Sequence, residues 1–213
     1  MSQPDTIERI LDAAAALFAE RGYSETSLRT ITTTANVNLA AVNYHFGSKK
    51  ALIQAVFSRY LAPFCECLNS NLDAREKASD QAIHVDEAIQ ILFSSLFQST
   101  EAIGGGLEPF MRLLGLAYAQ SQEHLRHFII EEYGDTYRRF MEILQADMPD
   151  VDPVAFYWRL YFMLGATVFT LSSYNPINNI SKADFGEERS IKEVVSLLEP
   201  SISTLLRADD AER

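Results

Sequence analysis

Residues 22–52 read GYSETSLRTITTTANVNLAAVNYHFGSKKAL, and this stretch decides the fold. Thr26 or Ser27 can cap a short helix, because their hydroxyls accept hydrogen bonds from free N–H groups at a helix start. The run Asn36–Asn38 has the residue types of a tight turn, after which Leu39–Phe46 can form another short helix. Two short helices joined by a tight turn predict a helix-turn-helix, whose second helix enters the major groove of DNA.

Helical spacing of apolar residues recurs along the whole chain, and no period-two strand pattern persists. An amino-terminal helix is expected up to Gly22, which suits a helix end. The sequence therefore predicts an all-α protein of about nine helices, the later ones near residues 48–72, 87–102, 107–120, 122–147, 152–174 and 190–207. Asp152 followed by Pro153 marks one start, and Ser190 with Glu193 forms a capping box at another. The charged stretch 73–86 is expected to be a solvated loop or a frayed helix end.

The charge distribution points to one surface for nucleic acid. The chain carries a net charge of −11, which is unusual for a DNA-binding protein. Residues 21–60, however, contain five Lys or Arg and one Glu, a net +4, so the remainder carries −15. This asymmetry predicts a small basic face on an acidic molecule that repels DNA elsewhere.

The helix-turn-helix pattern predicts that residues 1–50 form a DNA-binding domain, and we expect residues 51–213 to form a larger helical domain for ligand binding and dimerisation. Of 13 Phe, only three precede residue 60, so the second part holds most of the aromatic side chains. The segment 155–174 is almost wholly apolar. Because Arg159 and several hydroxyl groups interrupt it, we expect a helix buried on all sides at a subunit interface rather than a membrane span.

The short helix 39–46 carries side chains suited to reading bases. Val42 and Phe46 form its inward face, four residues apart. On the other face, Asn43 can pair with adenine through two hydrogen bonds, and Leu39 or Ala41 can contact a thymine methyl group.

The runs Gly22–Arg29 (GYSETSLR) and Val42–Leu52 (VNYHFGSKKAL) resemble the TetR family of bacterial transcription regulators. The resemblance covers roughly the first quarter of the chain. It implies that Leu39, Ala41 and Asn43 face bases, that Arg29 reaches a base or phosphate, and that Thr26, Tyr44, His45 and Lys49 hold phosphates. The full predicted DNA-binding set is Thr26, Ser27, Arg29, Asn38, Leu39, Ala41, Asn43, Tyr44, His45 and Lys49. For Lys50, a contact with DNA and a solvated position beside Lys49 are equally good interpretations.

Three runs, Asn38–Arg59, Phe110–Ala117 and Phe162–Ala166, are similar to the PsrA-type branch of that family. The resemblance implies a repressor released by a long-chain fatty acid or its acyl-CoA form and controlling genes of fatty-acid metabolism. The predicted ligand-binding residues are Phe93, Phe97, Met111, Arg112, Tyr118, Tyr137, Met141, Phe162 and Phe169. Arg112 would pair with the ligand carboxylate. The alternatives are that the aromatic residues only fill a core and that Arg112 pairs with Glu108 or Glu131.

For subunit assembly we expect a homodimer formed by the helices near 152–174 and 190–207, which would make a four-helix interface. A two-fold dimer on double-stranded DNA requires a roughly palindromic operator. We expect the ligand to favour a spacing of the two reading helices that no longer fits successive major grooves.

Two other function classes remain as alternatives. An amphipathic drug-like cation could replace the lipid as ligand, in which case acidic residues should lie in the pocket. An enzyme is disfavoured, because no nucleophile–base set, no glycine-rich phosphate loop and no metal-binding spacing of the four His is present. We therefore expect no cofactor and no metal. Without a visible signal peptide or membrane span, the expected location is the cytoplasm.

Overall fold

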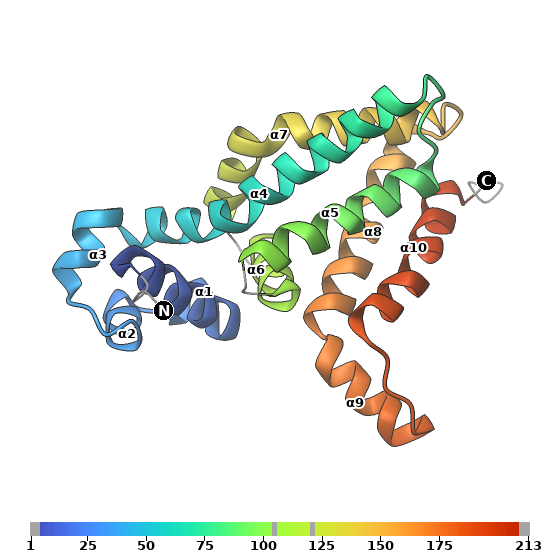
Figure 1. The fold of residues 1–213 in the computed structure, drawn as a ribbon. Helices are drawn as coiled ribbons and strands as arrows, with labels where there is room; N and C mark the ends of the chain where they lie inside the picture. The colour runs from blue at the N-terminus through green and yellow to red at the C-terminus, as the bar shows by residue number, and fades with distance from the viewer. Residues whose placement is uncertain (1–4, 104–105, 120–121, 209–213) are drawn as a thin grey trace.

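The computed structural model describes residues 5–103, 106–119 and 122–208, and within them the protein is all-α. Figure 1 shows the arrangement of the helices, which are α1 (Thr6–Glu25), α2 (Leu28–Thr34), α3 (Leu39–Phe46), α4 (Lys49–Ala78), α5 (Val85–Ile103), α6 (Leu107–Ala119), α7 (Glu123–Ala146), α8 (Pro153–Ser172), α9 (Tyr174–Phe185) and α10 (Ile191–Arg207). The predicted fold class is confirmed. We call α1–α3 the head and α5–α10 the body; α4 belongs to both.

Side-chain caps fix where most helices begin. Ser27 Oγ accepts the Thr30 N–H at 3.0 Å, and Ser48 Oγ accepts the Ala51 N–H at 3.0 Å. Ser190 and Glu193 form the expected capping box at the start of α10. Each cap satisfies an N–H that has no partner within its own helix. These helix starts were therefore predictable from single residues.

Helix α4 connects the head to the body and is longer than predicted. Of the two interpretations of residues 73–86, the helix end fits the first part, because α4 continues to Ala78, and the loop fits only the residues between Ala78 and Val85. The charged residues of α4 do not face only solvent. Arg139 of α7 pairs with Asp73 at 2.6 Å and with Glu76 at 2.9 Å, and Arg75 pairs with Glu87 of α5. Ion pairs to two neighbouring helices thus support the last turns of α4.

The head is packed firmly against the body. Helix α1 lies against both α4 and α6. Arg59 of α4 pairs with Asp12 at 2.6 Å and with Glu8 at 3.2 Å, both on α1. The ring of Tyr60, the next residue of α4, stacks on Phe110 of α6 with centroids 5.2 Å apart. These contacts join the first helix, the connecting helix and the body into one core.

In the single chain helix α8 is buried on one face and exposed on the other, and the exposed face is the one left for the predicted subunit interface. Its inner face packs against α6 and α10, and the buried Arg159 donates to the Leu206 carbonyl at 2.9 Å. Its outer face exposes Trp158 and Phe169 by 56% and 66% in the single chain. By length and composition alone α8 could cross a membrane, and among the described helices it is the one that meets this criterion.

Close approach of α6 to α8 depends on a glycine. A Cβ atom added to Gly115 would lie 3.1 Å from Val168 Cγ1. Real Cβ contacts are rarely this short, so an alanine at position 115 would require the Val168 side chain to shift by a few tenths of an ångström.

Helix α9 was not predicted. Its sequence contains Pro176 and two adjacent Asn, which are poor helix formers, and it buries no residue. Contacts at its base hold it. The Tyr174 hydroxyl donates to the Arg189 carbonyl at 2.6 Å, and the Arg189 N–H donates to Asn178 Oδ1 at 2.9 Å. In Figure 1, α9 projects away from the other helices.

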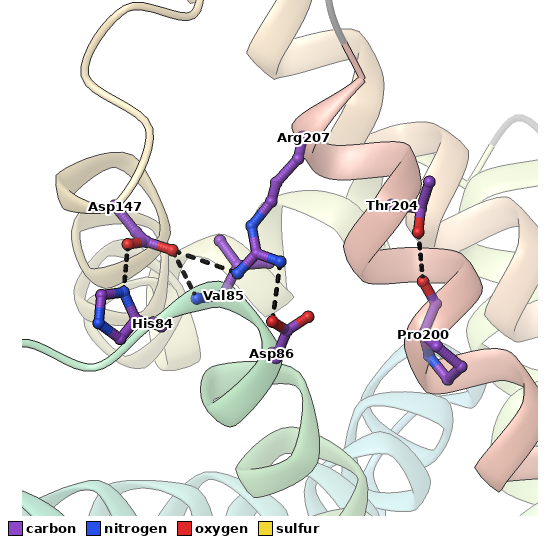
Figure 2. A network of polar contacts seen from close by, with 7 residues as sticks. All are labelled: His84, Val85, Asp86, Asp147, Pro200, Thr204 and Arg207. Carbon is purple, nitrogen blue, oxygen red and sulfur yellow. Dashed lines mark hydrogen bonds and ion pairs between the residues drawn. The ribbon is translucent and has the colours of Figure 1, made fainter.

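A polar network joins α5, α7 and α10 at the end of the body away from the head (Figure 2). Asp147 accepts hydrogen bonds from His84 Nδ1 at 2.6 Å and from the Val85 N–H at 2.9 Å. Arg207 of α10 donates to Asp86 at 2.8 Å and reaches Asp147 at 3.5 Å. Asp147 therefore caps α5 from a different part of the chain.

Burial would raise the pKa of Asp147, but the hydrogen bonds from Val85, His84 and Arg207 outweigh it and hold that pKa below its ordinary value. A carboxylate with a depressed pKa stabilises the folded state fully above its unfolded-state pKa of about 4. This stabilisation is lost as the pH falls through the folded-state pKa.

We therefore expect Asp147→Asn to lower the free energy of unfolding by about 1–3 kcal/mol at pH 7, since a half-buried hydrogen-bonded charge is removed. The difference from wild type should shrink as the pH falls from 5 to 3. Urea unfolding at pH 7, 5 and 3 measures both effects. Asp150→Asn, at an exposed position three residues further on, is the matched control and should change little. Equal losses in the two variants would show that the network does not stabilise the body.

Candidate DNA-binding site

Helices α2 and α3 form the expected helix-turn-helix. Asn36 in the turn has φ 51°, a conformation that Asn tolerates better than most residues. The Val37 N–H donates to the Thr32 carbonyl at 3.0 Å and closes the turn. Ile31 of α2 and Val42 of α3 are fully buried beneath it. The two short helices are thus held at a fixed angle by a tight turn and a shared apolar contact.

The outer face of α3 presents the side chains predicted to read DNA. Leu39, Asn43 and His45 are exposed, and Tyr44 is 86% exposed. The rings of Tyr44 and His45 meet edge to face with centroids 5.1 Å apart. Ala41 is half-buried on the same helix. An exposed ridge containing an amide, small apolar groups and two aromatic rings is what base contact in a major groove requires.

Two of the predicted residues also act as helix caps. Asn38 Oδ1 accepts the Ala41 N–H at 2.8 Å, and Ser27 Oγ accepts the Thr30 N–H. Both are exposed at the amino ends of α3 and α2, where free N–H groups can receive phosphate oxygens. Arg29 is exposed on α2.

The prediction that the Thr26 side chain holds a phosphate is wrong. Thr26 is fully buried, and its hydroxyl donates to the Gly22 carbonyl at 2.8 Å and to the Leu17 carbonyl at 3.2 Å. These carbonyls are left free because Gly22, with φ 82°, interrupts the helix at that point. Thr26 therefore stabilises the end of the first helix.

Lys49 begins α4 at the edge of the same surface. Its Nζ lies 4.3 Å from the centroid of the Tyr23 ring and donates to the Ser24 carbonyl at 3.5 Å. Burial lowers the pKa of Lys49, and the nearby Glu25 carboxylate partly opposes this. The ammonium group is thus placed beside the junction of α1 and α2, close to the exposed face of the head.

The comparisons with known proteins give the family. Residues 10–56 match the family model described as bacterial regulatory proteins, tetR family, and residues 90–203 match the model described as tetracyclin repressor-like, C-terminal domain. The second match alone covers more than half of the chain. The chain belongs to the TetR family. It is therefore a DNA-binding transcriptional regulator, and the helix-turn-helix of α2 and α3 is its DNA-binding motif.

Individual TetR-type relatives are distant. The chain is 25% identical over 147 residues to the probable HTH-type transcriptional regulator YttP of Bacillus subtilis, covering 65% of this chain and 69% of YttP. It is 31% identical over 94 residues to IcaR of Staphylococcus aureus, a negative transcriptional regulator of the biofilm operon icaADBC, covering 44% of this chain. The match spans 47% of IcaR, about half its length.

Solved TetR-type structures share the fold. The regulator PfmR from Thermus thermophilus is 20% identical, with a TM-score of 0.56 over 96% of this chain and 100% of that one. The fatty acid degradation regulator FadR from Bacillus halodurans is 16% identical, with a TM-score of 0.58 over 98% of both chains. At these identities the likeness concerns the fold alone.

In this TetR-family chain the nine predicted ligand-binding residues do not line one cavity. Phe93 and Met111 are buried in the core, and Phe97 and Met141 are half-buried. The other aromatic members lie on the surface: Tyr118, Tyr137, Phe162 and Phe169. The core-filling alternative therefore holds for the buried members, and the exposed ones need another explanation.

The prediction for Arg112 also changes. Arg112 is exposed and pairs with Glu108 at 2.7 Å, one turn earlier on α6, and its Nε donates to the Ser172 carbonyl at 3.3 Å. Asn175 donates to the other oxygen of Glu108 at 2.6 Å. The intramolecular ion pair, which was the alternative interpretation, is the one observed. Arg112 links α6 to the junction of α8 and α9.

Two cavities in the described part of the chain lie elsewhere. An open cavity of about 630 Å³ lies between α4 and α7 and is lined by Lys50, Gln54, Glu123, His124, His127, Phe128 and Glu131. A smaller one of about 100 Å³ lies between α8, α9 and α10. His124 and His127, three residues apart on α7, line the larger cavity and were not among the predicted ligand-binding residues.

Proposed function

We propose that this regulator is a homodimeric repressor in the cytoplasm that binds a roughly palindromic operator and is released by a long-chain fatty acid or acyl-CoA. In this proposal residues 1–50 bind DNA and residues 51–213 bind the effector and dimerise. The observation that supports DNA reading best is the exposed face of α3 beside Lys49. The basic charge of this region supports it further.

We assign the DNA contacts by chemistry. Asn43 reads a base edge, and Leu39 and Ala41 contact a thymine methyl group. Tyr44, His45, Arg29 and Lys49 contact phosphates. Lys49 lies in the first turn of α4, where the positive end of the helix dipole also attracts a phosphate. Ser27 and Asn38 cap α2 and α3 and so position the amino ends of these helices, which face the DNA backbone. These contacts combine sequence-specific and sequence-independent binding.

The outer face of α8 supports the homodimer. Trp158, Phe162 and Phe169 are exposed there, and Leu197 of α10 is exposed as well. Gly165 lies between them, and a Cβ at that position would meet nothing within 4 Å. An apolar face of this size on a soluble regulator calls for a partner, and a small central residue lets a second helix approach closely. Pairing of α8 and α10 with their copies would form a four-helix interface.

The effector assignment rests on the similarity to the PsrA-type branch and on the aromatic content of the body. The nine predicted ligand residues include no acidic side chain, whereas the open cavity between α4 and α7 is lined by Glu123 and Glu131 as well as by Lys50. Since the nine predicted residues are not gathered around one cavity, binding of an acyl chain would require the body helices to separate. Such a change gives the effector a route to alter the spacing of the two heads.

The DNA contacts predict two different mutant phenotypes on a duplex selected from a random library with the wild-type protein. Lys49→Ala should reduce the salt dependence of binding by about one ion per subunit, because one phosphate contact is lost. Asn43→Ala should weaken binding by about 1–3 kcal/mol and relax the preference at one base pair. Fluorescence anisotropy at several salt concentrations measures both. Lys77→Ala, at the far end of α4, is the matched control. An unchanged salt slope in Lys49→Ala would remove the phosphate assignment.

The dimer predicts a molecular mass of twice 24.0 kDa in sedimentation equilibrium. Gly165→Arg should raise the dissociation constant about tenfold or more, because an unpaired charge would be buried between the subunits. The single chain has room for the new side chain, so folding should be unaffected. Ile130→Arg, at an exposed apolar position on α7, is the control. Trp158, the only Trp, reports dissociation by its fluorescence. Unchanged mass in Gly165→Arg would place the interface elsewhere.

The effector assignment predicts that oleate or oleoyl-CoA releases the protein from the selected duplex. Mass spectrometry of the purified protein should detect co-purified acyl lipids. Tetraphenylphosphonium, a lipophilic cation, serves as the comparison ligand. If saturating lipid leaves DNA binding unchanged, the fatty-acid assignment fails, and release by the cation instead would establish a drug-type effector.

A further inference from the structure

The ring of Tyr23 is where three parts of the chain meet. Tyr23 follows Gly22 at the end of α1, and its ring lies 5.9 Å from that of Phe18 within the head. Lys49 Nζ of α4 lies 4.3 Å from its centroid. His124 of α7 lies 5.2 Å from it, ring centroid to ring centroid. The body therefore contacts the Tyr23 ring, on which Lys49 rests, through the side chain of His124.

Lys49 depends on this support. Its Nζ makes one hydrogen bond, a long one of 3.5 Å to the Ser24 carbonyl, and otherwise contacts the face of the Tyr23 ring. A cation over an aromatic face is attracted by the ring's negative quadrupole. The position of the ammonium group therefore follows the position of the ring. A shift of the ring would move it relative to a DNA phosphate.

His124 is held in place by packing and not by hydrogen bonds. Its Nε2 atom is buried and has no hydrogen-bond partner among the described residues. One side of the residue borders the open cavity between α4 and α7. Because the contact between His124 and Tyr23 has no polar anchor on the histidine, movement of α7 can change it at low cost.

We propose that His124 is a positioning residue for DNA binding, which holds the Tyr23 ring and through it Lys49, so that a shift of α7 alters a phosphate contact. This inference rests on the proposed function of Lys49. It gives the body a direct connection to the DNA-binding surface within one subunit, in addition to any change in the spacing between two heads.

The charge state of His124 adds a dependence on pH. Burial lowers the pKa of His124, and the positive charge of Lys50 lowers it further. The charged and titratable groups around it are Tyr23 of α1, Lys49 and Lys50 of α4, and Glu123, His127 and Glu131 of α7. Because the packed histidine favours the neutral form, the contact is strongest above about pH 6.5 and weakens as the pH falls below that value.

Variants at position 124 test the proposal on the duplex selected with the wild-type protein. His124→Ala and His124→Gln remove the ring and should weaken binding about tenfold, with a fall in the salt slope of about one ion per subunit, as in Lys49→Ala. His124→Phe keeps a ring and should restore both. His127→Ala, which lines the same cavity, should behave as wild type. A loss of affinity caused only by a less stable fold would leave the salt slope unchanged.

A double-mutant cycle decides whether the two residues act together. His124→Ala should have little further effect when Lys49 is already Ala. Additive losses, or a wild-type salt slope in His124→Ala and His124→Gln, would overturn the proposal. If the wild-type protein selects no duplex, the proposed function itself fails, which is a distinct result.

The pH dependence gives a second measurement. Wild type should lose more affinity than His124→Phe between pH 7.5 and pH 5.5. Both proteins keep His45 in α3, so the difference between them isolates position 124. Identical pH profiles would show that titration of His124 does not affect DNA binding.

Discussion

The packing of α1 against both α4 and α6 fixes how the DNA-binding surface sits on the rest of the molecule. Arg59 pairs with Asp12 and Glu8, and Tyr60, the next residue of α4, stacks on Phe110. The recognition helix α3 has few residues of its own to bury and is held by α1, α2 and α4. Since α4 is continuous from Lys49 to Ala78, its amino end cannot move independently of this packed region. Helix α4 is about 45 Å long and contains Pro63, so its body end and Lys49 are connected through a position that lacks one backbone hydrogen bond.

The sequence predicted those features that depend on single residues or on local spacing. Ser27, Ser48 and Ser190 mark helix starts because a cap needs only one side chain and its neighbouring backbone. Gly22 interrupts the first helix for an equally local reason. The ridge of α3 could be predicted because its buried Val42 leaves the opposite face exposed.

Features that depend on distant partners could not be predicted. The local sequence of the charged end of α4 favours a loop or a frayed helix end. The ion pairs that support the helix there come from Arg139, more than 60 residues away. Helix α9 has weak local propensity and is held by Arg189, after the helix has ended. The burial of Thr26 could not be predicted, because its hydroxyl donates to carbonyls that are free only where Gly22 breaks the helix.

Apolar spacing on a helix also cannot distinguish a core, a pocket and a subunit interface. Phe93 fills the core, whereas Phe162 and Phe169 have the same helical pattern and lie on the surface of the single chain. All three environments satisfy the same periodicity, because each removes apolar surface from water. The composition of the body was therefore informative about its size and class, but not about where a ligand would bind.

The connection through Tyr23 bears on how sensing and DNA binding can be coupled. An effector can shift the equilibrium only by the difference in its affinity for two conformations, so the body needs an element that differs between them. Most contacts between head and body are buried apolar packing or ion pairs, which resist small changes. The His124–Tyr23 contact borders open space and has no hydrogen bond on the histidine, so breaking it costs less than separating α1 from α6. By linkage, DNA that holds Lys49 in place would in turn favour the packed position of α7 and oppose effector binding by the same free energy.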